Sequence, residues 1–256
     1  MHFWKYCGAG NDFVILENFD GSIAPERYAA LAAALCREHF SVGADGLMVL
    51  EPPAQGGDCR MRFYNRDGST AEMCGNGARC LCRHCHDRGL ASGPVQHIET
   101  PAGLVTGRRI TADRYRIRLN RPSVVRLHVE AEGVRCAYLE LGEPGIPRAE
   151  LRELAARLRS SPAFPRGANV NLCAVTGENR VRLLTFERGV EDFTLACGTG
   201  TGATVAALAR LGLVSGGGTQ VQTDGGMLSV DLDGEDIDLT GPAELTFTGD
   251  LPELPA

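Results

Sequence analysis

Two cysteines in this chain lie in the same local setting, 123 positions apart. Cys74 is followed by Gly75-Asn76-Gly77, and Cys197 is followed by Gly198-Thr199-Gly200, and each turn leads into a stretch that can form a helix. A thiol at the start of a helix faces backbone N–H groups and the positive end of the helix dipole, which stabilise a thiolate. Two such thiols predict an acid/base pair that acts on one substrate atom.

The chemistry that suits two opposed thiols is the inversion of a carbon centre by proton transfer. One cysteine is the thiolate base, and the other, as a thiol, returns a proton to the opposite face. Negative charge spreads onto a substrate carboxylate as the α-carbon loses its proton, and N–H donors at the helix starts stabilise it. The candidate donors are Gly75, Asn76, Gly198 and Thr199.

The similarity between the two segments extends well beyond the two cysteines. With the same offset, pairs of identical residues recur: Phe63 and Phe186, Gly89 and Gly212, Thr100 and Thr223, Gly103 and Gly226. Two long copies indicate two homologous domains rather than a solenoid. We expect residues 1–120 to carry Cys74 and residues 121–245 to carry Cys197, with segment 246–256 a candidate to pack back on the first domain. Pseudo-twofold packing would place the active site in the cleft between the domains.

Hydrophobic patterning predicts an α+β fold with many short strands around a few helices. The expected helices are Pro25–His39, Asn76–Arg88, Ala149–Ser160 and Thr201–Leu211. The expected strands are Phe13–Leu16, Leu47–Leu50, Met61–Tyr64, Asn169–Val175, Val181–Phe186, Val221–Thr223, Met227–Leu232 and Ile237–Leu239, with further strand-like stretches within Arg109–Ile117 and Val124–Val134.

Composition excludes several classes of protein. The chain has 256 residues, a net charge of −6 and an ordinary 43% of hydrophobic residues, so nothing indicates binding to nucleic acid or to an anionic membrane. The N-terminus lacks the pattern of a signal peptide, and we expect a cytoplasmic protein with reduced cysteines. Lys5 is the only lysine and precedes the first expected strand, so a pyridoxal-phosphate enzyme, which needs a Schiff-base lysine, is excluded.

Motifs along nearly the whole chain resemble the diaminopimelate epimerase family. They are Gly8-Ala9-Gly10-Asn11-Asp12-Phe13, Phe63-Tyr64-Asn65-Arg66-Asp67-Gly68-Ser69, Cys74-Gly75-Asn76-Gly77-Ala78-Arg79-Cys80, Phe186-Glu187-Arg188-Gly189 and Thr194-Leu195-Ala196-Cys197-Gly198-Thr199-Gly200. The two cysteine motifs are typical of cofactor-independent epimerases and racemases that use two thiols. The Gly-Asn-Asp-Phe and Glu-Arg-Gly elements are typical of the diaminopimelate branch.

The resemblance implies a fold, a function and roles for individual residues. In the implied fold, each of the two domains is a mixed, curved β-sheet around a central helix. Cys74 and Cys197 would interconvert LL- and meso-diaminopimelate in lysine biosynthesis, without cofactor or metal, and the enzyme would be a possible homodimer. The residues expected to hold the substrate are Asn11, Asn65, Asn169, Glu187 and Arg188. An arginine–carboxylate contact would orient the symmetric substrate, and Glu187 would also polarise the second thiol.

One stretch departs from the family pattern. The family usually carries a histidine after Gly-x-Pro between its halves, close to the first cysteine. Here the stretch is Leu141-Gly142-Glu143-Pro144-Gly145-Ile146-Pro147-Arg148, so Arg148 or, with a shifted alignment, Gly145 takes its place. An arginine cannot relay a proton at neutral pH, but its charge can stabilise a thiolate. The departure therefore bears on the substrate more than on the type of reaction.

Other interpretations stay open. The protein could be a racemase or epimerase for another amino acid, a relative that binds an amino acid without turnover, or a thiol redox or metal-binding protein. Cys80-Leu81-Cys82-Arg83-His84-Cys85-His86 resembles a metal motif, but on one helix it does not place four ligands tetrahedrally, so packing residues are expected. The asparagines could be turn residues, Glu187 and Arg188 a surface ion pair, and Arg148 a solvated residue at a helix start.

Overall fold

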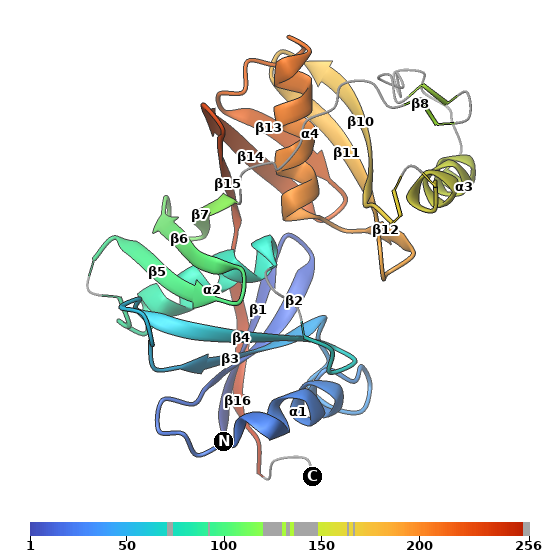
Figure 1. The fold of residues 1–256 in the computed structure, drawn as a ribbon. Helices are drawn as coiled ribbons and strands as arrows, with labels where there is room; N and C mark the ends of the chain where they lie inside the picture. The colour runs from blue at the N-terminus through green and yellow to red at the C-terminus, as the bar shows by residue number, and fades with distance from the viewer. Residues whose placement is uncertain are drawn as a thin grey trace. The chain divides into compact units, whose positions relative to one another are not determined.

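The computed structural model describes residues 1–70, 74–91, 93–119, 130–131, 134–135, 148–162, 164–165 and 167–252. It divides into two compact units, unit 1 (Met1–Arg118 with Thr240–Ala256) and unit 2 (Leu119–Leu239). The chain leaves unit 1 within strand β7 (Arg114–Leu119) and returns within β15 (Asp236–Pro242), as the colours of Figure 1 show. Each unit is described separately.

Unit 1 is built on a mixed sheet with the strand order β7-β6-β5-β4-β3-β2-β1-β16. Its remaining strands are β1 (His2–Gly8), β2 (Asn11–Glu17), β3 (Gly46–Glu51), β4 (Cys59–Asn65), β5 (Val95–Thr100), β6 (Gly103–Arg109) and β16 (Glu244–Asp250). The pairs β2–β3 and β4–β5 are parallel, and their neighbours within the unit are antiparallel.

Helix α2 (Gly75–Asp87) is the central helix of unit 1, because it contacts β1, β2, β5, β6 and β16. A short 3-10 turn (Pro25–Arg27) and helix α1 (Tyr28–Leu35) cover β3 and β4 instead. The side chains of Leu31 and Leu35 are buried there in a cluster with strand residues of β2 and β3. Burial of each leucine stabilises the unit by ~1.5–3 kcal/mol.

Helix α1 ends four residues before the predicted end at His39. The N–H of Gly43 donates to the carbonyl of Leu35 at 2.9 Å, which closes the helix and turns the chain back toward β3. Arg37, Glu38 and His39 follow as exposed residues, and His39 has a φ of 67°. The polar residues that the sequence predicted to be the end of the helix therefore form a turn instead.

Unit 2 repeats the same plan. Its strands are β10 (Val170–Gly177), β11 (Arg180–Glu187), β13 (Thr219–Thr223) and β14 (Gly226–Asp233), ordered β10-β11-β13-β14-β15, with β12 (Asp192–Thr194) on β11 and a short pair of β8 (Glu130–Ala131) and β9 (Val134–Arg135) apart from them. Helix α4 (Gly198–Arg210) contacts β10 and β14, and α3 (Arg148–Arg159) contacts β10, β11 and β12. Leu151 and Ala155 of α3 are buried against Val170, Leu172 and Phe186.

The two units share element lengths as well as sequence. Helices α2 and α4 are both 13 residues long, and β6 and β14 begin at Gly103 and Gly226, with φ of 111° and 130°. In each unit an antiparallel pair (β3–β4, β10–β11) is followed by a parallel neighbour (β5, β13). The α+β class, with a mixed sheet around a central helix in two homologous halves, is confirmed. The boundaries 1–120 and 121–245 remain a proposal.

Four strands of unit 1 were not predicted from the sequence: β1, β5, β6 and β16. Lys5 accordingly does not precede the first strand but lies within β1, where its side chain is 6% exposed. The expected strand-like stretch Val124–Val134 lies largely outside the described residues. No helix in the described part of the chain is both long and apolar enough to cross a membrane.

Candidate active site

Cys74 occupies the residue immediately before helix α2. Its backbone is extended, with φ −126° and ψ 118°, and its carbonyl accepts the first helical hydrogen bond from the N–H of Ala78 at 2.8 Å. The side chain is half-buried. Because the N–H groups of the first turn, those of Gly75 and Asn76 among them, have no acceptor within the helix, this end of α2 favours an anion.

Asn76 and Asn11 are brought together from α2 and β2. Asn11 follows a two-residue turn in which Ala9 and Gly10 both have positive φ, a geometry that matches the twist of a hairpin. The Nδ2 of Asn76 donates to the Oδ1 of Asn11 in a short hydrogen bond, and the Nδ2 of Asn11 donates to the Oδ2 of Asp45 at 3.1 Å.

Asn65 lies at the same end of the sheet as Asn11. Gly46 pairs with Phe13 on one side and with Asn65 on the other, which places the last residue of β4 near the first residues of β2. The Nδ2 of Asn65 donates to the Oγ of Ser69 at 2.9 Å within the following turn. Its place on the sheet is compatible with substrate binding, which remains a prediction.

Arg79 lies one turn further along α2 and is completely buried. Its Nη2 donates to the Oδ1 of Asn76 at 2.9 Å and its Nε donates to the carbonyl of Pro242 at 3.3 Å. Burial lowers the pKa of Arg79 to about 10, which leaves it a cation at neutral pH. Among the described residues no carboxylate lies within ion-pair distance of it.

Cys197 has the equivalent place before helix α4 in unit 2. Its φ of −118° and ψ of 114° are close to those of Cys74. The Sγ accepts from the N–H of Gly200 at 3.4 Å and lies 3.5 Å from the Oγ1 of Thr199. The Nδ2 of Asn169 also donates to it, at 3.9 Å. These donors surround a side chain that is 7% exposed, and together they favour a thiolate.

The residues expected to bind substrate in unit 2 adjoin this cysteine through Asn169. The backbone N–H of Arg188 donates to the Oδ1 of Asn169 at 2.9 Å, and the Arg188 residue is exposed. The carboxylate of Glu187 accepts from the Oγ1 of Thr194 at 2.6 Å. Polarisation of the Cys197 thiol by Glu187 stays a prediction.

Arg148 is the first residue of α3 and is exposed. Its Nη1 lies 2.8 Å from the Oδ2 of Asp224, and its guanidinium lies 4.9 Å from the ring centre of Phe193. Burial of Asp224 tends to raise its pKa, but hydrogen bonds from Arg182 and Arg148 outweigh burial and lower the pKa. Arg148 thus forms an ion pair within unit 2, with a carboxylate that it shares with Arg182. The alternative position, Gly145, lies outside the described residues.

The cysteines of the metal-like motif are packing residues. Cys80, Cys82 and Cys85 are fully buried on α2. The Sγ of Cys85 lies 3.6 Å from the Sγ of Cys59 on β4. Burial raises the pKa of Cys80 and Cys82, whereas in Cys85 the hydrogen bond with Cys59 raises it first and burial adds to it. These thiols therefore stay protonated at neutral pH.

Sequence reasoning missed four polar residues that contact the predicted site residues or each other beside them: Asp45, Arg79, Asn171 and Thr185. The Oγ1 of Thr185 donates to the Oδ1 of Asn171 at 2.9 Å, and Asn171 lies against Gly200. Asp45 had a weak signal, since it stands before a glycine at the start of a buried strand. The only sequence signal for Arg79 was its place in the cysteine motif, because a single sequence does not distinguish a buried arginine from an exposed one.

Comparison with known proteins places this chain in a family. The family model described as "Diaminopimelate epimerase" matches residues 3–118 and 144–246. The diaminopimelate epimerase of Methanothrix thermoacetophila is 37% identical, over 97% of this chain and 95% of its own length. The diaminopimelate epimerase of Xanthomonas axonopodis pv. citri is 35% identical, over 98% of this chain and 96% of its own length.

Solved structures show the same fold at low sequence identity. A PhzF-family phenazine biosynthesis protein of Bacillus anthracis matches with a TM-score of 0.72 at 16% identity, covering 98% of both chains. A probable proline racemase of Agrobacterium radiobacter matches with a TM-score of 0.68 at 16% identity, covering 98% of this chain and 92% of that one. The full-length relatives and the family model together show that this chain belongs to the diaminopimelate epimerase family, as an isomerase independent of pyridoxal phosphate.

Proposed function

We propose that this chain inverts one α-carbon of diaminopimelate, converting the LL form to the meso form, with Cys74 and Cys197 as the acid/base pair. The observation that carries this proposal is the recurrence of one cysteine setting in both units. Each thiol stands directly before a 13-residue helix, on extended backbone with nearly the same φ and ψ. The choice of diaminopimelate as the substrate rests on the names of the full-length relatives.

The proposed reaction is a balanced pair of proton transfers. The thiolate of one cysteine takes the proton from the α-carbon, and the electron pair of the broken C–H bond spreads onto the α-carboxylate. The thiol of the other cysteine then donates its proton to the opposite face, so one thiolate and one thiol remain at the end. N–H donors at the starts of α2 and α4 stabilise the carboxylate as charge develops on it.

Polar side chains would hold the two ends of the substrate. Asn11 and Asn65 are assigned to substrate binding in unit 1, together with the backbone N–H of Asn76, and Asn169, Glu187 and Arg188 are assigned to it in unit 2. Arg188 is an exposed residue whose guanidinium suits a bidentate contact with a carboxylate, and we assign it to the carboxylate distal to the reacting carbon. Such a contact selects a substrate with a second carboxylate.

Deuterium incorporation tests the reaction directly. Purified protein is incubated with LL-diaminopimelate in D₂O, and we expect deuterium at the α-carbon of the meso product. Parallel incubations with proline and with other amino acids test the alternative substrates. Incorporation into one of those alone would contradict the assignment of diaminopimelate, and the absence of incorporation into any amino acid would contradict the epimerase.

The two cysteine roles are separated by substrate analogues with a leaving group on the β-carbon. Elimination from them needs only the base, so Cys74→Ser and Cys197→Ser should each process one stereoisomer better than the other, with opposite preferences. Both variants should lose epimerisation by orders of magnitude, because an alcohol is far less acidic than a thiol. Identical preferences in the two variants would contradict the two-base mechanism.

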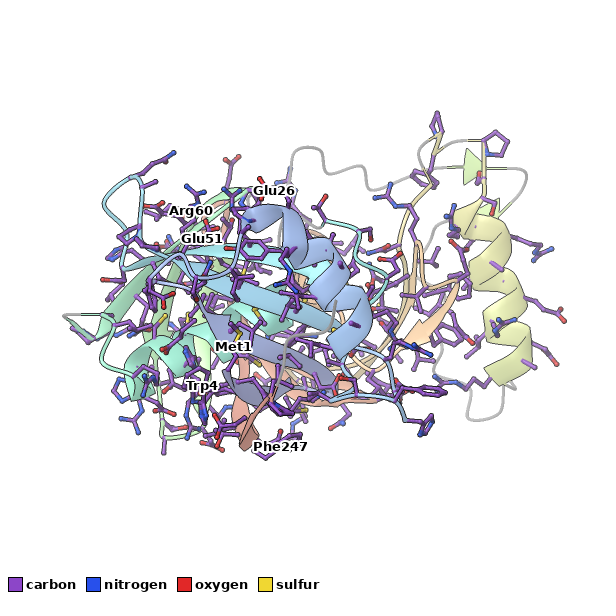
Figure 2. All side chains as sticks on the ribbon, turned by 90° about the horizontal axis from the view of Figure 1, so that it is seen from below. Met1, Trp4, Glu26, Glu51, Arg60 and Phe247 are labelled. Carbon is purple, nitrogen blue, oxygen red and sulfur yellow. The ribbon has the colours of Figure 1, made fainter. Side chains whose placement is uncertain are left out.

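We also propose a homodimer, and a place in lysine biosynthesis in the cytoplasm. Strand β16 is the edge strand of unit 1, and its Leu245 and Phe247 are 40% and 46% exposed; Figure 2 labels Phe247 at the margin of this unit. An exposed edge with large apolar side chains is suited to pairing with a second copy. Phe247→Lys should shift the protein from dimer to monomer in analytical ultracentrifugation. Epimerase activity in the soluble fraction of lysed cells would support the cytoplasmic location.

A further inference from the structure

A chain of three hydrogen bonds runs from Arg79 through two amides to Asp45. The Nη2 of Arg79 donates to the Oδ1 of Asn76 at 2.9 Å, and the Nδ2 of Asn76 donates to the Oδ1 of Asn11. The Nδ2 of Asn11 then donates to the Oδ2 of Asp45 at 3.1 Å. The chain thus connects the first turn of α2 with the start of β2 and the residue before β3.

The two ends of this chain differ in hydrogen-bonding capacity. A guanidinium can only donate, and an ionised carboxylate can only accept. An asparagine amide does both, and its oxygen and nitrogen exchange places when the group flips. With Arg79 at one end, Asn76 must present its oxygen to it. With Asp45 at the other end, Asn11 must present its nitrogen.

Both end groups are anchored independently of the amides. Arg79 is fully buried, its Nε donates to the carbonyl of Pro242, and within the described part of the chain its Nη1 has no hydrogen-bond partner. A buried cation with an unsatisfied donor is costly, which indicates a role for its remaining contact with Asn76. The Oδ2 of Asp45 also accepts from the N–H of Asp12 at 3.2 Å, and the Oδ1 of Asp12 accepts from the N–H of Asp45 at 2.9 Å.

We propose that Arg79 and Asp45 are positioning residues that lock the amides of Asn76 and Asn11 in one orientation. This inference rests on the proposed function, in which both asparagines bind the substrate. Asn11 is partly exposed and spends one N–H and one oxygen lone pair on the chain, so the lock also fixes where its second N–H and its second lone pair point. The half-site next to Cys74 therefore offers the substrate the Asn11 amide in a fixed orientation before binding, without the need to reorient.

The inference is tested with double-mutant cycles on the full chain, measured as kcat/KM with LL-diaminopimelate. Asp45→Asn keeps the size of the side chain but can donate as well as accept, so it releases the lock. We expect a loss of about ten-fold or more in the wild-type background and of less than about two-fold in the Asn11→Ala background. The matched control is Asp20→Asn, an exposed aspartate of the same unit, which should change kcat/KM by less than about two-fold.

The other end is tested in the same way. Arg79→Gln should cost about ten-fold or more, and much less when Asn76 is already alanine, whereas Arg79→Lys, which still only donates, should restore part of the activity. If the Arg79 variants do not fold, the Asp45 cycle decides alone. Additive losses in the Asp45 cycle would overturn the inference while leaving the proposed function intact. If, by contrast, the wild-type protein itself does not epimerise LL-diaminopimelate, the proposed function is contradicted.

Discussion

At the scale of single residues, the two proposed catalytic thiols share a backbone setting but differ in exposure. Cys197 accepts from Gly200 and Asn169 and is 7% exposed, and Cys74 is half-buried, five residues before the buried cation of Arg79. A two-base mechanism needs one thiolate and one thiol at a time. A difference in burial is one way to keep the two cysteines in different protonation states.

Alkylation of the folded protein should single out Cys74. It combines partial exposure with a helix N-terminus, which makes it the most reactive thiol of unit 1. Cys36, Cys80 and Cys82 should resist, because burial raises their pKa, in Cys36 to about 12. The measurement is peptide mass spectrometry after brief iodoacetamide treatment at neutral pH, with urea-unfolded protein as the control. Early labelling of Cys80 or Cys82 would contradict the prediction.

Arg188→Ala should raise KM more than it lowers kcat. The reason is that a contact with the distal carboxylate is made equally in the ground state and in the transition state. Arg210→Ala is the matched control, since Arg210 is an exposed arginine at the opposite end of α4 from Cys197. Steady-state kinetics on both variants decides. An equal fall in kcat with an unchanged KM would instead assign Arg188 to the reacting end.

At the scale of elements, equivalent helices of the two units differ in how closely they approach the sheet. Gly77 of α2 and Gly200 of α4 are the third residues of their helices. A Cβ on Gly77 would lie 3.1 Å from the end of the flexible Met48 side chain. A Cβ on Gly200 would lie 2.5 Å from the Oδ1 of Asn171, which the hydroxyl of Thr185 holds in place.

Gly200→Ala should therefore destabilise the protein more than Gly77→Ala. We expect about 1–3 kcal/mol for Gly200→Ala, as for other overpacked sites, and less than about 1 kcal/mol for Gly77→Ala, where the gain in helix propensity offsets the contact with Met48. Urea unfolding followed by circular dichroism measures both. Equal losses would mean that Asn171 moves aside as easily as Met48.

The last turns of α2 are tied to β2 by Glu17. Its carboxylate lies 3.0 Å from the Nε2 of the buried His84 and 2.8 Å from the Nε of Arg88. Burial tends to raise the pKa of Glu17, but the hydrogen bonds from His84 and Arg88 outweigh it and lower the pKa to about 2.

Glu17→Gln should destabilise the protein by about 1–3 kcal/mol at pH 7. Since the folded pKa lies below the unfolded one, the carboxylate's contribution is fully present above about pH 4.5 and is lost as the pH falls to about 2. The difference between wild type and variant in urea unfolding should shrink across that window. A difference that is constant from pH 7 to pH 3 would show that charge is not the cause.

At the scale of the whole chain, unit 1 is closed by its last strand. Strand β16 pairs with β1, and the two chain ends are joined where the amino group of Met1 donates to the carbonyl of Leu251 at 2.8 Å. Phe3 of β1 is buried, and Phe247 lies edge-on to it with ring centres 6.0 Å apart. Strands that are far apart in sequence, with pairs from His2–Asp250 to Cys7–Glu244, thus complete one sheet.

A chain that ends at Ala243 should lose the stability of unit 1. Without β16 the backbone groups of β1 lose their partners and Phe3 loses cover, so limited proteolysis should cut first within residues 1–118 or the protein should be insoluble. A chain that ends at Pro252 keeps β16 and Leu251, and serves as the control. First cuts within residues 148–239 would contradict the prediction.

Much of the architecture could be predicted from the sequence. The offset between Cys74 and Cys197 predicted the duplication, and both cysteines do directly precede a helix. Helix starts could be predicted because they depend on the residue types of a short local segment. Most of the strands of unit 2 were predicted from short apolar runs. Strands β1, β5, β6 and β16 were not, since a strand forms through a partner that is distant in sequence. No residue of β16 is classed as buried.

The tertiary structure alone decided which polar residues support the site. Arg79 and Lys5 look like surface cations in the sequence, but both are buried. Arg79 donates a hydrogen bond to Asn76, and the Nζ of Lys5 lies 2.7 Å from the Oδ2 of Asp12. Arg148 instead binds Asp224 at the surface of unit 2. The motifs determined the reaction class because catalysis requires particular residue types at fixed local spacing. The orientation of Asn11 and Asn76 depends on charges carried by other elements, and those distances exist only in the folded chain.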